Sequence, residues 1–208
     1  MKKLVLAAVA VFAIGNSAFA QQEVKFGPKA GVNFSNISGQ DNAEMKTGFH
    51  VGAVAEIKFN EKFSIQPEVL YSAQGAKYEY FVGNNKLADA TQSLDYINIP
   101  IMAKYYIVDG FSVEAGPQVG FLTKAESKFE NAVTGSSLTS GDNKDNFKSV
   151  DFGVNFGLAY DLPSGLFINA RYNLGLSKIA EDVTVGNTTV SAPDHKNSVI
   201  QVGLGYKF

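Results

Sequence analysis

The strongest constraint on the fold of this chain is a two-residue alternation of apolar and polar side chains. In Val150–Asp161, which reads VDFGVNFGLAYD, every even position is apolar and every odd position is small or polar. The same alternation runs through Gly165–Ser177 and Asn197–Phe208. A helix would space its apolar residues three or four positions apart, whereas a strand turns successive side chains to opposite faces. The pattern therefore predicts strands with one apolar and one polar face.

Eight segments follow this pattern, and we predict one strand for each. They are Lys25–Ser35, Thr47–Phe59, Phe63–Gln74, Leu94–Ile107, Phe111–Leu122, Val150–Asp161, Gly165–Ser177 and Asn197–Phe208. Four prolines lie inside these strands: Pro28, Pro67, Pro100 and Pro117. Each removes a donor from the hydrogen-bond ladder, so we expect bulges or register shifts at some of them.

The connections between the predicted strands alternate in length. Short turns follow the second, fourth and sixth strands, at Asn60–Lys62, Val108–Gly110 and Leu162–Ser164. The other connections are longer, and the longest, Thr123–Ser149, is polar and rich in glycine, serine and asparagine. With an even number of strands, both chain ends lie on the short-turn side. This layout is typical of an antiparallel up-and-down transmembrane β-barrel with short periplasmic turns and long extracellular loops.

The glycines indicate which face of the strands is inside. Eleven of the 20 glycines lie within predicted strands, without counting Gly165 at the start of one, and all eleven fall on the polar face. An eight-stranded barrel is so narrow that side chains fill it, and glycines on its inner wall make room for long polar neighbours. The polar face should therefore line the lumen, while the apolar face contacts lipid. A soluble barrel would have the opposite arrangement.

The first residues have the features of a secretory signal peptide. Lys2 and Lys3 precede the apolar run Leu4–Ile14, and Ala18-Phe19-Ala20 fits the small-x-small cleavage pattern. We therefore divide the chain into a signal peptide, residues 1–20, and a barrel domain, residues 21–208, with the mature start near Gln21. The apolar run is too short for a spanning helix, which needs about 20 residues.

Composition excludes several classes of function. The chain has no cysteine, which rules out disulfides, thiolate metal sites and cysteine nucleophiles. Its 18 basic and 20 acidic residues give a net charge of −2, and loss of Lys2 and Lys3 would make it −4. A mildly acidic chain has no basic field for nucleic acid, so we expect no nucleic-acid partner.

Several segments in the predicted order resemble a known family. They are GPKAGVNFSNI, LDYINIPIMAKYYI, FSVEAGPQVGFLT, VDFGVNFGLAYDL, ARYNLGLSKIAED and the ending QVGLGYKF. Together they resemble the outer-membrane β-barrel domain family of Bacteroidetes-type bacteria, often labelled PorT-like. The resemblance implies an eight-stranded outer-membrane barrel and little about activity, although the member that names the family takes part in protein secretion. Phe208 matches the terminal aromatic residue by which many such barrels are recognised for assembly.

Residues suited to catalysis or metal binding are few. His50 should point into the lumen near the extracellular rim, whereas lipid-modifying barrel enzymes have catalytic Ser and His residues that face lipid; His195 lies in the last loop. Asp142 and Asp145 lie in a loop that lacks the EF-hand pattern. We therefore predict no enzymatic activity, no cofactor and no metal site.

Charged residues on the polar face predict a network inside the barrel. They are Lys29, Glu56, Glu68, Lys104, Glu114, Asp151 and Arg171. Buried charges must pair, because an unpaired one costs several kcal/mol or loses its ionisation. We expect Arg171 to reach the acidic residues and Lys104 to lie between its neighbours.

These observations favour an outer-membrane barrel with a plugged lumen and a structural or interaction role, for example as part of a membrane or secretion assembly. The expected partners are outer-membrane lipid and lipopolysaccharide, the barrel-assembly machinery through the C-terminal strand, and proteins at the extracellular loops. A small porin-like pore for ions or small solutes is the alternative, and a lipid-modifying enzyme is a third possibility.

Overall fold

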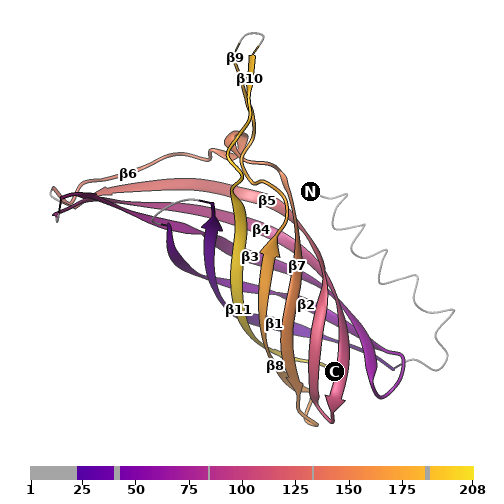
Figure 1. Cartoon of the computed structure of the whole chain (residues 1–208). Helices are drawn as coiled ribbons and strands as arrows, with labels where there is room; N and C mark the ends of the chain where they lie inside the picture. The colour runs from indigo at the N-terminus through magenta and orange to yellow at the C-terminus, as the bar shows by residue number, and fades with distance from the viewer. Residues whose placement is uncertain (1–22, 40–42, 84, 133, 186–187) are drawn as a thin grey trace.

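The computed structural model describes residues 23–39, 43–83, 85–132, 134–185 and 188–208. The predicted signal peptide lies outside these residues. Eight long antiparallel strands form one ring, in the order β4-β3-β2-β1-β11-β8-β7-β5, which closes through the pairing of β4 with β5 (Figure 1). The eight-stranded antiparallel barrel predicted from the sequence is therefore confirmed.

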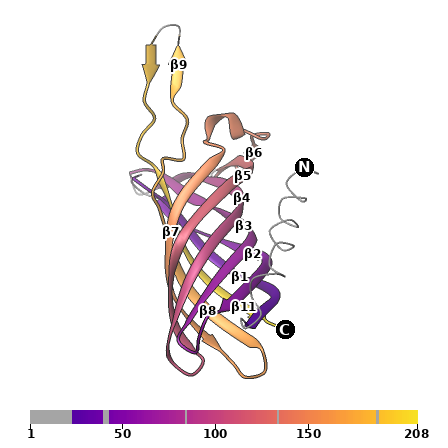
Figure 2. The same ribbon diagram turned by 90° about the vertical axis from the view of Figure 1, so that its right-hand side faces the viewer.

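The barrel strands are β1 (Glu23–Ser38), β2 (Ala43–Lys58), β3 (Phe63–Val82), β4 (Asn85–Val108), β5 (Phe111–Asn131), β7 (Val150–Asp161), β8 (Leu166–Gly175) and β11 (Lys196–Tyr206). Four short elements lie in the long connections: β6 (Ser137–Thr139), the 3-10 turn η2 (Lys144–Asn146), β9 (Val183–Val185) and β10 (Thr188–Val190). Strand β6 pairs with β5, and β9 pairs with β10 as a separate hairpin above the ring (Figure 2).

The strands of the β3–β4–β5 sector are much longer than predicted. The sequence pattern suggested ends at Gln74, Leu94 and Leu122, but the three strands continue to Val82, Asn85 and Asn131. They extend together past the rest of the ring (Figure 1). The first part of the predicted loop 123–149 is therefore strand, because pairing continues after the simple alternation of apolar outer and polar inner residues has ended.

The prolines do not cause the register shifts that we expected. Residues Pro28, Pro67, Pro100 and Pro117 each have a regular cross-strand partner. The irregularities lie elsewhere, at Met45/His50, Tyr80/Phe81, Asp95/Tyr96 and Tyr106/Val108. A proline removes one N–H donor but adds no residue to the strand, so the ladder can continue through it without a change of register.

Burial alternates along the strands with a period of two residues. In β8 the outward residues, among them Ile168 and Tyr172, are exposed, and the inward residues are buried. Gly203 shows why glycine lies on the inner wall: a Cβ at this position would lie 2.9 Å from Lys29 Cε and 3.1 Å from His50 Nε2. Small inward residues thus make room for long polar ones, and the large apolar side chains cover the outside.

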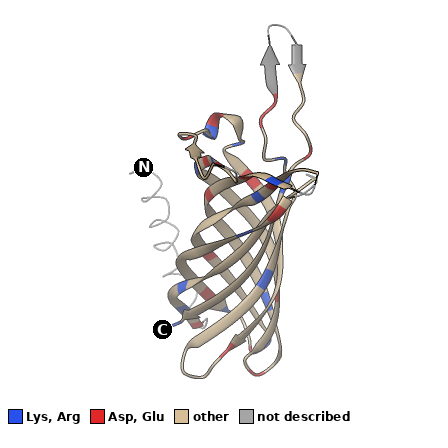
Figure 3. Cartoon of the chain, turned by 90° about the vertical axis from the view of Figure 1, so that its left-hand side faces the viewer, with Lys and Arg blue, Asp and Glu red and all other residues tan. Residues whose placement is uncertain are grey.

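None of the helical segments in the described part of the chain is long and apolar enough to cross a membrane. Charged residues gather on the extended strands and loops at one end of the barrel (Figure 3).

Candidate functional site

At the end of the barrel with the short turns, the lumen contains a compact cluster of charged side chains. The Lys207 ammonium lies 2.5 Å from Glu56 Oε2 and 2.5 Å from Asp161 Oδ1. The Lys104 ammonium lies 2.8 Å from Asp161 and 3.7 Å from Glu56. The Tyr106 hydroxyl lies within hydrogen-bond distance of both carboxylates and donates its one proton to either of them. Two lysines therefore balance two carboxylates. We call this group the lower network.

Glu56 and Lys104 were predicted from the sequence to belong to a lumen network. Asp161, Lys207 and Tyr106 were not. The alternation itself carried the signal, since all three residues fall on the inward face of their strands. They were overlooked because they lie close to strand ends, where a charge or a phenol is easily read as an interfacial residue.

A second network lies at the middle of the barrel, around Arg171. Its guanidinium binds Glu68 through two nitrogens at 2.9 Å each and Glu114 through Nε at 2.9 Å. The Lys29 ammonium lies 3.1 Å from Glu68, which also accepts a hydrogen bond from Gln66 at 2.7 Å. These ionic side chains are at most 1% exposed. Two cations again balance two carboxylates, and we call this group the central network.

Above the central network, uncharged polar side chains fill the lumen. Asn33 Oδ1 lies 2.8 Å from His50 Nδ1 and accepts a hydrogen bond from Gln201 at 3.1 Å. Asn155 donates to Gln118 at 3.1 Å and accepts from Asn173 at the same distance. His50 is 1% exposed and belongs to this layer, so it lies inside the packed lumen and not at the rim.

The seven charges predicted to form one network are divided in the structure: two lie in the lower network, four lie in the central network, and Asp151 lies apart from both. Asp151 accepts hydrogen bonds from Ser177 at 2.5 Å and Asn197 at 2.8 Å. Asp151 starts β7, whereas Asp161 ends it, so the two carboxylates lie at opposite ends of the barrel. Sharing the inward face does not bring two residues together when the strand is longer than the reach of their side chains.

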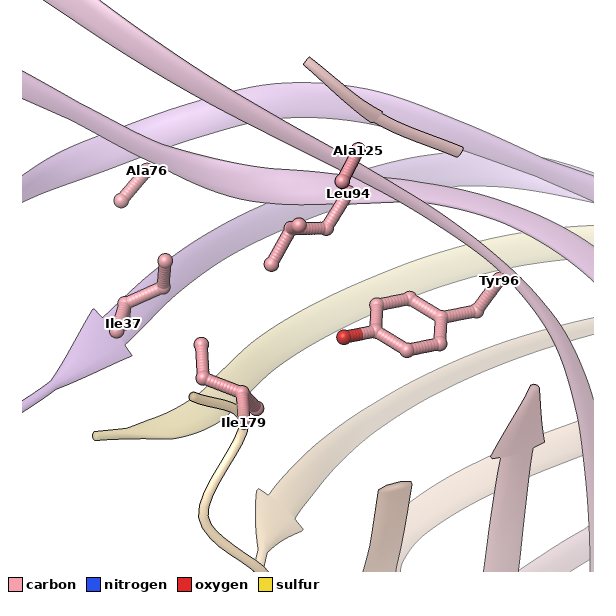
Figure 4. Close-up of a cluster of buried hydrophobic side chains, with 6 residues drawn as sticks. All are labelled: Ile37, Ala76, Leu94, Tyr96, Ala125 and Ile179. Atoms are coloured by element: carbon pink, nitrogen blue, oxygen red, sulfur yellow. The ribbon is translucent and has the colours of Figure 1, made fainter. Parts of the chain in front are cut away.

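The end of the barrel with the long loops is filled by apolar side chains. A buried cluster, the apolar cap, consists of Ile37, Ala76, Leu94, Tyr96, Ala125 and Ile179 (Figure 4). Loops fold onto it through backbone hydrogen bonds from Lys148 to Ile179 and from Ile179 to His195, at 2.8 and 2.9 Å. Residues from strands and loops thus pack together across this end of the lumen.

The two faces of the β3–β4–β5 extension have the opposite polarity to the barrel wall below. On its outer face, Lys86 pairs with Glu79 at 2.5 Å and with Asp89 at 2.7 Å. On its inner face, Tyr80 and Phe129 stack with their ring centroids 5.7 Å apart. The inversion follows from the solvent, because the outer face meets lipid on the barrel wall and water beyond it.

The candidate metal ligands from the sequence do not form a group. Asp142 pairs with Lys144 at 2.9 Å, and the hydrogen bond from this ammonium lowers the pKa of the Asp142 carboxyl. Within the described ranges, no three His, Asp or Glu side chains are placed so that they could hold a metal ion.

Comparison with known proteins gives a family match. The family model described as outer membrane protein beta-barrel domain matches residues 19–181. No curated protein matches the chain significantly.

Solved structures with similar folds include the attachment invasion locus protein Ail of Yersinia pestis, with 15% identity and a TM-score of 0.48, covering 89% of this chain and 99% of Ail. Neisserial surface protein A has 16% identity and a TM-score of 0.49, with the same coverage. OprG of Pseudomonas aeruginosa has 16% identity and a TM-score of 0.37, covering 90% of this chain and 95% of OprG.

Proposed function

Since the chain belongs to the outer membrane protein beta-barrel domain family, we propose that it is a non-conducting barrel of the outer membrane that acts through its extracellular surface. The observation that carries the proposal is the filling of the lumen at successive levels. The lower network, the central network, the layer of uncharged polar side chains around Asn33 and Asn155, and the apolar cap follow one another from the short turns to the long loops. Because these layers lie in series, a solute would have to displace all of them.

Planar-bilayer recordings test this role. The wild-type barrel is expected to show no steady conductance, and Arg171→Ala should also remain closed, because the lower network and the apolar cap do not contain Arg171. A general porin refolded in the same way provides the positive control. Steady single-channel openings of the wild type would reject the closed barrel and favour the small pore.

One observation supports the alternative of a small pore. Several lumen side chains have a buried polar atom without a protein partner among the described residues, including Asn98, Glu114 and Gln201. Water commonly satisfies such groups, and a hydrated lumen would favour ion passage. We give the closed barrel precedence because the ionic side chains of the central network are held by short, mutually compensating pairs.

The orientation of the barrel is tested by epitope tags. With a tag inserted after Ser137, next to the extended strands, intact cells should bind the antibody. A tag after Glu61, in a short turn, should bind antibody only after the outer membrane is permeabilised. Labelling of intact cells at Glu61 but not at Ser137 would reverse the orientation.

Export and assembly follow from the same role. We propose cleavage of the signal peptide after Ala20, which amino-terminal sequencing of the mature protein would test. Phe208 is 77% exposed, and its ring packs edge-on against the Tyr206 ring with the ring centroids 4.9 Å apart. We propose that the barrel-assembly machinery recognises this exposed aromatic pair. We also propose that the chain is a PorT-like barrel with a role in a secretion assembly. The sequence segments that resemble this family support the proposal.

We also propose that the barrel is not an enzyme. His50 lies against Asn33 inside the lumen, where a membrane lipid cannot reach it. Lipopolysaccharide is the proposed neighbour of the charged outer face of the β3–β4–β5 extension, because lysines such as Lys86 and Lys128 lie there beyond the lipid-facing wall.

A further inference from the structure

A pocket of about 120 Å³ lies among the extracellular loops, next to the apolar cap. Its apolar walls are Ile37, Phe147, Ile179 and Ala180, which come from the end of β1, the loop after η2 and the loop after β8. Ile37 and Ile179 also belong to the cap, so the wall of the pocket is continuous with the packed cluster (Figure 4). Segments far apart in the sequence thus build one pocket.

The size and lining of this pocket limit what it can take. Apolar cavities of about 150 Å³ in proteins stay dry and bind benzene or xenon. This pocket has a similar volume and isoleucine and phenylalanine walls, but it opens to solvent on one side. It suits one compact ring and is too small to enclose a long chain or a sugar polymer. Burial of such a ring removes apolar surface from water, which favours binding.

The polar residues that line the pocket are Tyr78, Gln92 and His195. His195 is engaged elsewhere, and its backbone carbonyl accepts a hydrogen bond from Ile179. The Tyr78 hydroxyl makes no hydrogen bond to any described residue, and burial raises the pKa of Tyr78 to about 12, so the hydroxyl stays protonated at neutral pH. The amide of Gln92, which also lines the pocket, is engaged by Ser127 at 2.5 Å and by the Glu126 carbonyl at 3.2 Å. Tyr78 is therefore the group that can donate to a bound acceptor.

The approach to the pocket is apolar as well. Along β3, Tyr80 follows Tyr78 on the same face, and its ring stacks on Phe129. Both rings are about half exposed, at 46% and 49%, although they lie in water beyond the lipid-facing wall. Exposed aromatic side chains beside a pocket are a common feature of ligand sites.

We propose that this pocket binds a compact apolar ring that carries one hydrogen-bond acceptor, with the Tyr78 hydroxyl donating to the acceptor and the ring lying between Ile37, Phe147 and Ile179. The inference rests on the proposed function, since it gives a ligand class to the extracellular surface through which the barrel acts.

The test uses isoleucine δ1-methyl NMR of the whole mature barrel in detergent micelles. Two probes are compared: cyclohexanone, which has a carbonyl acceptor, and methylenecyclohexane, which replaces it with C=CH₂. The signals of Ile37 and Ile179 should shift and saturate with cyclohexanone. The outward methyls of Ile101, Ile168 and Ile200 report simple partition of the probe into the micelle, because these side chains are exposed on the barrel wall.

Variants then assign the hydrogen bond and the pocket. Tyr78→Phe should weaken cyclohexanone binding about 2- to 10-fold and leave methylenecyclohexane unchanged, as expected for the loss of one hydrogen bond. Tyr80→Phe, on the neighbouring inward position, should change neither. Ala180→Leu should fill the pocket and abolish the saturable shift of both probes.

Shifts of Ile37 and Ile179 that only parallel those of Ile101, Ile168 and Ile200 would overturn the proposal, because they would show partition without a site. Equal affinity of wild type and Tyr78→Phe for cyclohexanone would overturn the role of the hydroxyl. These results are separable from the proposed function: a barrel without this ligand site would still be non-conducting, whereas steady conductance would reject the closed barrel whatever the methyl signals show.

Discussion

Val202→Arg is expected to destabilise the folded barrel by about 2–4 kcal/mol, the cost of an arginine at the midplane of the bilayer in barrels of this type. Val202 lies in the middle of β11, points outward with 45% of its surface exposed, and pairs with Val32 and Ala170 on the two neighbouring strands. Urea titration of unfolding and refolding in lipid vesicles measures the loss in free energy of unfolding. An unboiled sample on a cold SDS gel should show less of the folded form.

Thr91→Arg is the matched control for this substitution. Thr91 also lies on the outer face, but on the extension of β4 beyond the lipid-facing wall, between the charged neighbours Lys77 and Lys128 across the sheet. There the arginine meets water, so the loss of stability should stay below about 1 kcal/mol, and it should come from repulsion by the two lysines opposite, which added salt screens. A similar loss at both positions would show that lipid does not end where the polarity of the sheet inverts.

Arg171→Ala is expected to have an effect of similar size, about 3–5 kcal/mol, for a different reason. It leaves Glu68 and Glu114 buried and facing each other with only Lys29 to compensate them. The removal of one partner from a buried ion pair is costly because the remaining charge stays without solvent. Thermal unfolding in detergent, followed by the loss of heat-modifiable migration, measures the destabilisation.

The double variant Arg171→Ala/Glu68→Ala isolates the interaction. It should recover part of the loss, since it removes the carboxylate that Arg171 holds through two nitrogens. The sum of the two single effects should exceed the double effect by at least 1 kcal/mol, as is usual for residues in one network. Additive losses would mean that water screens the lumen charges and that each acts alone.

The sequence predicted the barrel wall well because lipid and lumen impose opposite demands on alternate residues. Strand β7 was predicted with its observed bounds, and β8 and β11 within two residues of theirs. The rule behind these predictions holds only where one face meets lipid. On the β3–β4–β5 extension the outer face carries Lys86 and Glu79, the inner face carries Tyr80, and the expected pattern is therefore absent.

The interior was harder to predict than the wall, because a face assignment says nothing about depth. The charged residues of the central network lie close together because their four strands carry them to the same level of the barrel. Asp151 shares their face but not their level. The extracellular pocket was missed altogether, since its walls come from loops whose contact, such as the bridge between Phe147 and Ala180, leaves no periodic signal in the sequence.

The position of Lys207 has a consequence for how the ring is sealed. This side chain follows β11 and pairs with Glu56 of β2 and Asp161 of β7, so its ion pairs span the seam where β11 meets β1. A slip of one residue at that seam would turn Lys207 toward lipid and leave the two carboxylates with Lys104 alone. A misaligned seam would then carry a penalty at two places at once, one in the lumen and one in the bilayer. The lower network thus favours correct barrel closure, because its charges are balanced only when β1 and β11 pair in the observed register.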